Sequence, residues 1–316
     1  MTGTVQPRNS SLPDAWQPVT NELVHKHDRA EVLLKRFERT GPDTFTVSAV
    51  WPAKHSFYGT DVGVYDPMLF IETVRQNVPL LSHVGYEVPF EHRLIWQDFT
   101  CEIGRSAMQV TESQATLELR IACSRIVRRG PRMAALTMDV IALREGMHLG
   151  TARVRFTSNP PAVYRRLRGT RADLDRAVAA ALEPAPPVHP GLVGRAHGTD
   201  VVLSPSELQG RWLLRSDTGH PILFDHPVDH VPGMLLLDAA RQAAHAVSAP
   251  GAAAPVRFDA RFHRYVELDA PCWIAAESAQ PDLMGRPGVT VRALQNGEVA
   301  FSCSVATESP ALSRAA

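Results

Sequence analysis

Two segments of the chain carry an acidic residue that is followed, three and four positions later, by an arginine and a glutamine. Positions three and four apart lie on one face of a helix, so each set of three side chains points in one direction. A carboxylate in a cleft can act as a general base, and a neighbouring arginine can hold it ionised or bind an anionic group. The acidic residues and arginines are therefore candidate catalytic residues, and the glutamines are candidate substrate-binding residues. The two sets are Glu72, Arg75 and Gln76 in the first segment and Asp238, Arg241 and Gln242 in the second.

An ordinary ion pair with a nearby amide is the alternative interpretation of each set. On an exposed helix such a pair contributes only ~0.3–0.5 kcal/mol to stability. However, Leu235, Leu236 and Leu237 follow one another and cannot all lie on one stripe of a surface helix, so the helix is expected to be buried. Removing an ion pair from water is costly, and its occurrence in both segments therefore favours a functional role.

Histidines precede both helices, where a loop would bring them to the helix N-terminus. His55 precedes the first helix, and His226 and His230 precede the second. Each of them could instead be exposed or structural. Pro227 interrupts the spacing between His226 and His230 and no third ligand is evident, so no metal is expected. We take His55 and His230 as candidate substrate-binding residues, together with Gly233 at the start of the second helix.

The residues around the two sets predict the elements that position them. Asp66 and Pro67 are typical of a helix start, and that helix is expected to run to residue 82, with Pro79 kinking it or ending it early. A second helix is expected over residues 232–247. Aligning the two helices at an offset of 166 residues matches four of ten positions and places Trp96 on Phe262 in the strand after each helix. The chain is therefore predicted to contain two diverged copies of one domain.

Each predicted helix is followed by several β-rich runs with short turns between them. We expect an α+β fold in which each of two tandem antiparallel sheets wraps around a long central helix. The expected domains span residues 20–160 and 191–308. Residues 161–190 have a basic segment, an Ala-rich piece and a Pro-rich run, which together are typical of a linker.

The overall composition excludes several classes of function. The 316 residues include 33 basic and 33 acidic ones, which gives no support for nucleic-acid binding. No run is long and apolar enough for a membrane helix, and the polar N-terminus does not resemble a signal peptide, so a cytoplasmic protein without membrane contact is expected. The common nucleotide-binding and hydrolase motifs are missing, and no cofactor is expected.

Several segments, in order and over nearly the whole chain, resemble the A-factor biosynthesis (AfsA-type) hotdog family of γ-butyrolactone and furan signal synthases. A more distant resemblance, at Pro232-Gly233-Met234-Leu235-Leu236-Leu237-Asp238, is to the hotdog 3-hydroxyacyl thioester dehydratases, although Phe224 stands where those enzymes place a histidine. The segments that resemble the AfsA-type family are Val24-His25-Lys26, Arg39-Thr40-Gly41-Pro42-Asp43-Thr44-Phe45, His55-Ser56-Phe57-Tyr58-Gly59, Asp66-Pro67-Met68-Leu69, Glu72-Thr73-Val74-Arg75-Gln76, Pro161-Ala162-Val163-Tyr164-Arg165-Arg166-Leu167-Arg168 and Asp229-His230-Val231-Pro232-Gly233-Met234.

The AfsA-type resemblance implies a double hotdog fold and an acyltransferase. Such an enzyme moves a β-ketoacyl group from acyl carrier protein to the hydroxyl of dihydroxyacetone phosphate, on the way to a butyrolactone, butenolide or furan signal. In this reading Glu72 or Asp238 is the base, amides at a helix N-terminus form the oxyanion site, and Arg75, Arg241 or a loop arginine binds the phosphate. The chain would be a pseudo-dimer, and whether it forms a homo-oligomer stays open.

Two alternatives belong to other classes of function. A hotdog dehydratase or thioesterase would act on acyl thioesters without an acceptor alcohol. A non-catalytic protein would bind an acyl group or a signal molecule in the same groove.

Overall fold

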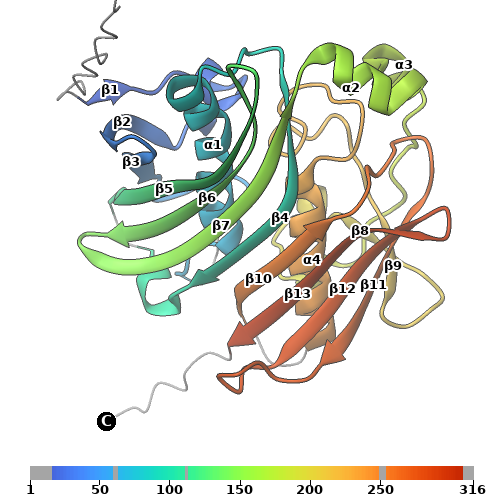
Figure 1. The fold of residues 1–316 in the computed structure, drawn as a ribbon. Helices are drawn as coiled ribbons and strands as arrows, with labels where there is room; N and C mark the ends of the chain where they lie inside the picture. Colours follow the sequence, from blue (N-terminus) through green and yellow to red (C-terminus); the bar gives the residue numbers. More distant parts are fainter. Residues whose placement is uncertain (1–15, 60–62, 111–112, 249–253, 309–316) are drawn as a thin grey trace, which may run out of the picture.

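A computed structural model of the chain describes residues 16–59, 63–110, 113–248 and 254–308. The first half contains a long helix and most of the strands of one sheet, and the second half repeats this order (Figure 1). The elements of the first half are β1 (Gln17–Pro18), β2 (Leu34–Gly41), β3 (Thr44–Trp51), α1 (Pro67–Tyr86), β4 (Arg93–Ile103), β5 (Ala115–Arg129), β6 (Arg132–Arg144) and β7 (Met147–Asn159). Those that follow are α2 (Pro161–Arg168), α3 (Leu174–Ala179), β8 (Leu203–Ser204), β9 (Arg211–Leu214), α4 (Gly233–Ser248), β10 (Ala254–Phe262), β11 (Cys272–Ala279), β12 (Gly288–Gln295) and β13 (Glu298–Glu308).

The strands of both halves form one continuous antiparallel sheet. Within the described residues its order is β1-β2-β3-β5-β6-β7-β4-β10-β13-β12-β11-β9-β8. The halves meet at β4 and β10, where Cys101 pairs with Phe258. Trp96 of β4 and Phe262 of β10 lie edge to face with ring centroids 6.0 Å apart. The two aromatic residues that the predicted repeat aligns thus contact each other across the junction.

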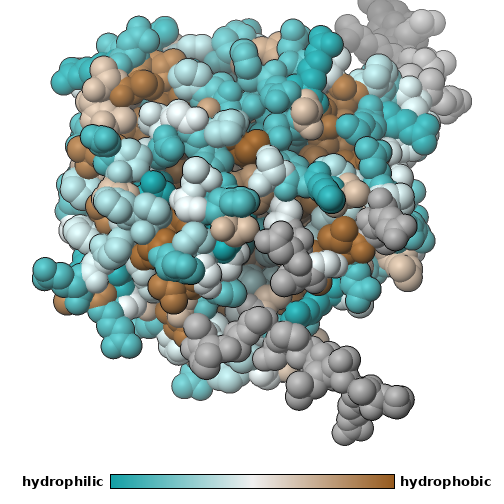
Figure 2. Space-filling view, turned by 180° about the vertical axis from the view of Figure 1, so that it is seen from behind, coloured by the Kyte–Doolittle hydropathy of each residue, from teal (hydrophilic) through white to brown (hydrophobic). Residues whose placement is uncertain are grey.

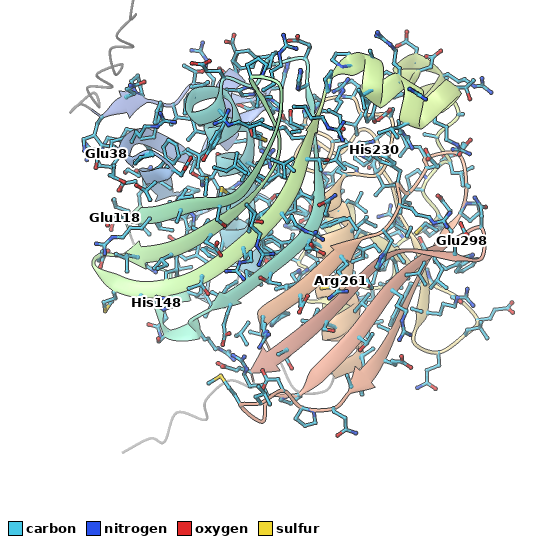
Figure 3. All side chains as sticks on the ribbon, in the orientation of Figure 1. Glu38, Glu118, His148, His230, Arg261 and Glu298 are labelled. Atoms are coloured by element: carbon cyan, nitrogen blue, oxygen red, sulfur yellow. The ribbon has the colours of Figure 1, made fainter. Side chains whose placement is uncertain are left out.

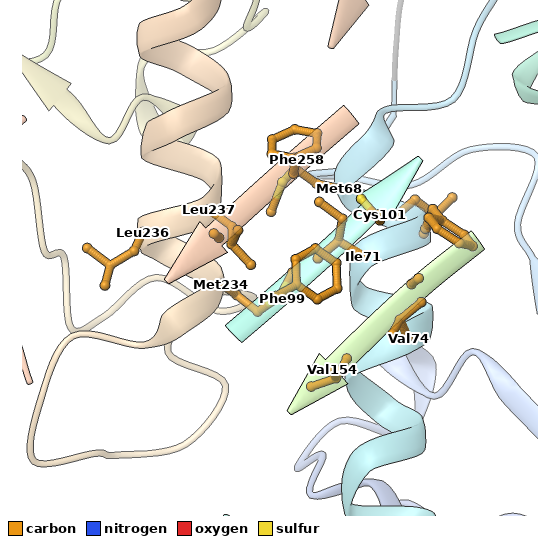
Figure 4. Packing of buried hydrophobic residues seen from close by; sticks show 14 of the residues in the cluster. Met68, Ile71, Val74, Phe99, Cys101, Val154, Met234, Leu236, Leu237 and Phe258 are labelled. Carbon is orange, nitrogen blue, oxygen red and sulfur yellow. The ribbon is translucent and has the colours of Figure 1, made fainter. Parts of the chain in front are cut away.

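Each long helix lies against the concave side of its own part of the sheet and is buried. In α4 every residue from Met234 to Ala244 is buried. Leu236 and Leu237 point to opposite sides of this helix (Figure 4), which only an enclosed helix tolerates. On α1, Met68, Ile71 and Val74 pack in the same hydrophobic cluster as residues of β4 and β7. The prediction of two buried central helices is confirmed.

Helix α1 continues beyond Pro79, and the expectation that this proline would end it early is wrong. The proline lacks only the one N–H that would have bonded the carbonyl of Arg75, and Val78 and Leu80 on either side of it are buried. The helix ends at Glu87, whose φ of 52° is left-handed and whose N–H bonds the carbonyl of His83. Burial of the second half of the helix outweighs the local cost of the proline.

The segment between the halves is helical where the sequence predicts a linker. Helices α2 and α3 cover one end of the sheets above the junction (Figure 1). The two turns predicted from Glu145-Gly146 and Asn296-Gly297 are present, and all four residues have positive φ. In the described ranges no helix is long and apolar enough to cross a membrane. On the face shown in Figure 2, hydrophobic residues occur in separate patches among hydrophilic ones.

Candidate active site

The first acidic set is a closed cluster of charges on α1. Arg75 donates to both carboxylate oxygens of Glu72, from Nε at 2.7 Å and from Nη2 at 2.9 Å. Lys26 Nζ lies 3.4 Å from Glu72 Oε1, and Gln76 Nε2 donates to the same oxygen at 2.9 Å. Burial alone would raise the pKa of Glu72, but Arg75 and Lys26 lower it to about 2. Glu72 is therefore an ionised anion with four hydrogen-bonding or charged contacts.

Gln76 and Arg75 also tie α1 to the chain before β2. The Gln76 side chain accepts from the amide of Leu33 at 2.9 Å and donates to the carbonyl of Glu31 at 2.7 Å. Arg75 Nη2 donates to the carbonyl of Val24 at 3.2 Å. The position of Arg75 is thus fixed from both ends of its side chain.

The second acidic set repeats this arrangement on α4. Arg241 Nε donates to Asp238 Oδ1 at 2.9 Å, and Gln242 Nε2 donates to Asp238 Oδ2 at 2.8 Å. Gln242 accepts from the amide of Val202 at 3.0 Å, as Gln76 does from Leu33. Arg195 Nη2 donates to Asp238 at 2.5 Å and takes the place that Lys26 has in the first set.

Lys26 and Arg195 belong to a second repeated segment that precedes each helix. Val24 and Val193 each end a short 3-10 helix, Glu22–Val24 and Pro190–Val193, and each is followed by a residue in the left-handed region. The offset between these segments is 169 residues. Sequence analysis placed neither cation in the site, because the offset differs from that of the helices and Lys is replaced by Arg.

Asp66 makes the second set different from the first. Its Oδ1 accepts from the amide of Met68 at 2.8 Å and caps α1. Its Oδ2 lies 3.0 Å from Nη1 of Arg195, a residue of the other half, and 3.8 Å from Nε of Arg241. Burial would raise the pKa of Asp238, but Arg195 and Arg241 lower it. The second set is therefore a fully buried network of two arginines and two carboxylates.

A cavity of about 710 Å³ lies between the halves, beside the first set. It extends from the middle of α1 to the N-terminus of α4 and is bordered by the strands β4 and β10. Its lining combines cationic, aromatic and aliphatic side chains. The lining residues used below are Lys26, Arg75, Val78, Leu94, Trp96, Tyr164, Asp229, His230, Pro232, Gly233, Met234, Leu236, Phe262 and Tyr265.

The cavity brings together only some of the predicted site residues. Arg75, His230 and Gly233 line it. The side chain of Arg75 is 20% exposed, whereas that of its counterpart Arg241 is 6% exposed. The remaining predicted residues do not line the cavity, although Glu72 and Gln76 contact Arg75, which does. The others are His55, Asp238, Arg241 and Gln242.

His55 has a structural environment. Its Nδ1 accepts from the amides of Phe57 and Tyr58, both at 3.1 Å, and its Nε2 lies 3.3 Å from Glu31. His220 repeats this environment in the second half, because its Nδ1 accepts from the amides at positions 222 and 223. The structural counterpart of His55 is therefore His220, which sequence analysis did not consider.

His230 faces the cavity and is oriented by its neighbour in the chain. Its Nδ1 lies 2.7 Å from Asp229 Oδ1, and its side chain is 28% exposed. Tyr164 of α2 donates to the same carboxylate at 2.7 Å. Burial would raise the pKa of Asp229, but the hydrogen bonds from His230 and Tyr164 lower it to about 2. Since an ionised carboxylate only accepts hydrogen bonds, Nδ1 of His230 carries the proton.

The second ring nitrogen of His230 is consequently the lone-pair nitrogen. Among the described residues this Nε2 has no hydrogen-bond partner. Figure 3 marks His230 below α2. An imidazole whose Nδ1–H is held by a carboxylate and whose Nε2 is free can accept a proton from a substrate.

Arg168 and Tyr265 complete this side of the cavity. Arg168 donates to both oxygens of Glu267, at 2.6 and 2.9 Å, and to the carbonyl of Asp229 at 3.1 Å. Its guanidinium lies 4.1 Å from the ring centroid of Tyr265. The buried Tyr265 hydroxyl has no hydrogen-bond partner among the described residues, and burial raises its pKa to about 12. It is thus a neutral donor without a partner.

Solved structures with a similar fold are acyl thioesterases. A 12:0-ACP thioesterase from Umbellularia californica has a TM-score of 0.53 at 9% identity and covers 86% of this chain and 99% of its own. A putative oleoyl thioesterase from Lactobacillus plantarum has a TM-score of 0.55 at 10% identity and covers 84% of this chain and 95% of its own. At such low identity the likeness concerns the fold alone, and the predicted double hotdog is confirmed.

Sequence comparisons extend over nearly the whole chain. A 2-oxo-3-(phosphooxy)propyl 3-oxoalkanoate synthase from Streptomyces virginiae is 42% identical over 93% of this chain and 98% of its own length. A protein of the same name from Streptomyces coelicolor is 39% identical over 92% of both chains. The profile of the A-factor biosynthesis hotdog domain matches residues 8–159 and, a second time, residues 177–308. The chain therefore belongs to the A-factor biosynthesis hotdog family.

Proposed function

We propose that this protein transfers a 3-oxoacyl group from acyl carrier protein to the hydroxyl of dihydroxyacetone phosphate. The name of the relatives describes the ester that this transfer makes, a 2-oxo-3-(phosphooxy)propyl 3-oxoalkanoate. The observation that carries the proposal is the cavity between the halves, where a free imidazole nitrogen and a set of cations share one space with an apolar wall. The product would lead to a butyrolactone, butenolide or furan signal in the cytoplasm.

The apolar wall of the cavity suits the acyl chain. Val78, Leu94, Trp96, Leu236 and Phe262 line it. Burial of a hydrocarbon chain against such side chains contributes about 0.8 kcal/mol for each CH₂ group. The thioester end would then lie near His230 and Tyr265, which line the same cavity.

His230 is the proposed general base. Its Nε2 would accept the proton of the acceptor hydroxyl as the oxygen attacks the thioester carbonyl. The new C–O bond forms, the C–S bond breaks, and the departing thiolate takes the proton from the imidazolium. Asp229 keeps the imidazole oriented and stabilises its charged form, and the Tyr265 hydroxyl is placed to donate to the carbonyl oxygen as negative charge develops there.

This assignment changes the roles expected of the two acidic sets. A carboxylate whose pKa is about 2 is a weak base, so Glu72 is proposed to position Arg75 and not to take a proton. Asp238 and Arg241 are proposed to be structural, because Arg195 and Asp66 fill the space beside them. The active site would then lie beside the first set alone.

The mass of the product tests the proposed function. The purified protein is incubated with a 3-oxoacyl carrier-protein thioester and dihydroxyacetone phosphate, and the products are identified by mass spectrometry. The phosphorylated ester is the expected product. An enoyl product from a 3-hydroxyacyl thioester, or release of free acid alone, would instead identify a dehydratase or a thioesterase, and the absence of turnover would favour a binding protein.

A further inference from the structure

The carboxylate of Asp66 is an anion bound at a defined position in the second set. It receives a hydrogen bond from the first turn of α1, at the amide of Met68, and lies 3.0 Å from Arg195 and 3.8 Å from Arg241. Two cations and a helix N-terminus therefore surround one negative group. This combination is a strong general site for an anion.

The equivalent position beside the first set is Pro232, which brings no carboxylate. Lys26 and Arg75 correspond to Arg195 and Arg241, and they line the cavity together with Pro232 and the start of α4.

The first turn of α4 has free donors at this point. Among the described residues the amides of Gly233 and Met234 have no hydrogen-bond partner. The first amides of a helix have no carbonyl of the same helix to bond. The donors that Asp66 satisfies at α1 are therefore open to the cavity at α4.

The charges of the two sets differ in the same sense. Two arginines face two carboxylates in the second set, whereas Lys26 and Arg75 share Glu72 in the first. Asp225 is a nearby carboxylate, but it accepts from the amide of His27 at 2.7 Å and forms no ion pair with Lys26 or Arg75. The first set thus lacks the second anion that balances its counterpart.

We infer that Lys26, Arg75 and the first turn of α4 form a subsite for a phosphate monoester, which takes the place that Asp66 has in the second set. The inference rests on the proposed function for the identity of the acceptor, dihydroxyacetone phosphate. His230 precedes Gly233 by three residues and lines the same cavity, so an acceptor anchored here by its phosphate presents its hydroxyl on the side of the base. Charge-assisted hydrogen bonds of this kind are among the strongest that proteins make.

A carboxylate placed at position 232 tests this subsite. The variant Pro232→Asp should supply the anion from within the chain, as Asp66 does, while Pro232→Asn has the same size without the charge. Binding of dihydroxyacetone phosphate is measured by isothermal titration calorimetry, so that the result does not depend on turnover. We expect Kd to rise about tenfold or more in Pro232→Asp and no more than about threefold in Pro232→Asn.

A second variant avoids any change at the helix start. Lys26→Gln should weaken binding of dihydroxyacetone phosphate and of inorganic phosphate about tenfold, with little effect on unphosphorylated dihydroxyacetone. Equal effects of Pro232→Asp and Pro232→Asn would overturn the inference, as would equal affinities of the wild type for the phosphorylated and unphosphorylated acceptors. Failure of the proposed function is a separate result, namely the absence of ester from the wild type.

Discussion

Asp66 of the first half and Arg195 of the second half form a buried ion pair, with 3.0 Å between Oδ2 and Nη1. The pair links the start of α1 to the charge network around Asp238 and fills the space that its counterpart beside Arg75 leaves open. One half of the duplication thus keeps an accessible site, and the other has converted the same residues into a connection between the halves.

The substitution Asp238→Asn should destabilise the protein without removing its activity. It would leave Arg195 and Arg241 buried with one carboxylate fewer, and breaking a buried pair in this way costs about 3–5 kcal/mol. Urea unfolding measures the loss, and steady-state turnover per folded molecule should stay within about threefold of the wild type. A large fall in turnover at full stability would place Asp238 in the active site after all.

Glu72 should make stability depend on pH in the acid range. Its pKa falls from the ordinary 4.5 to about 2 in the folded chain, so its contribution is complete above pH 4.5 and is lost as pH falls towards 2. The difference in unfolding free energy between the wild type and Glu72→Gln should shrink by about 3 kcal/mol over this range.

An exposed pair provides the control for this measurement. Glu118 bonds Arg120 at the surface, with a side chain 47% exposed. Glu118→Gln should change stability by no more than about 0.5 kcal/mol at any of these pH values. A difference for Glu72→Gln that stayed constant from pH 5 to pH 2 would contradict the assigned pKa.

His230→Gln should lower kcat for transfer to dihydroxyacetone phosphate roughly 100-fold or more, because no other free base is assigned in the cavity. Transfer to hydroxylamine, which attacks thioesters without a general base, should largely remain. The matched control is His148→Gln, since His148 lies in the β6–β7 hairpin, far from His230 (Figure 3). Loss of both reactions would indicate that His230 holds the thioester and does not act as base.

Tyr265→Phe should reduce kcat about 100-fold with a smaller effect on KM, because the hydroxyl is proposed to bond the carbonyl oxygen most strongly in the transition state. Tyr65→Phe is a suitable control, since the Tyr65 hydroxyl is also buried without a hydrogen-bond partner but does not line the cavity. Comparable losses in both variants would indicate a general effect of removing a buried hydroxyl.

The sequence predicted the repeated helices because their information is local. The spacing of Glu72, Arg75 and Gln76 follows from helix geometry, and the run of three leucines in the second copy indicates burial without knowledge of the sheet. The effect of Pro79 was misjudged because tertiary packing outweighed a local preference.

The composition of the active site depends on contacts between distant segments, which spacing cannot give. Lys26 lies 46 positions before Glu72, and Tyr164 lies 65 positions before Asp229. The difference between the copies rests on one residue, since Asp66 faces Pro232 in the alignment, and its meaning became visible only when Arg195 was found beside Asp66. The adjacent pair Asp229-His230 was readable, but its geometry was not.

The number of acceptor molecules bound to each chain tests most directly the claim that only one of the two equivalent positions is an active site. Equilibrium dialysis of the wild type against radiolabelled dihydroxyacetone phosphate should give one molecule bound per chain, and Pro232→Asp should abolish most of this binding. Two molecules bound per chain with similar affinity, or binding that Asp238→Asn removes and Pro232→Asp does not, would contradict it.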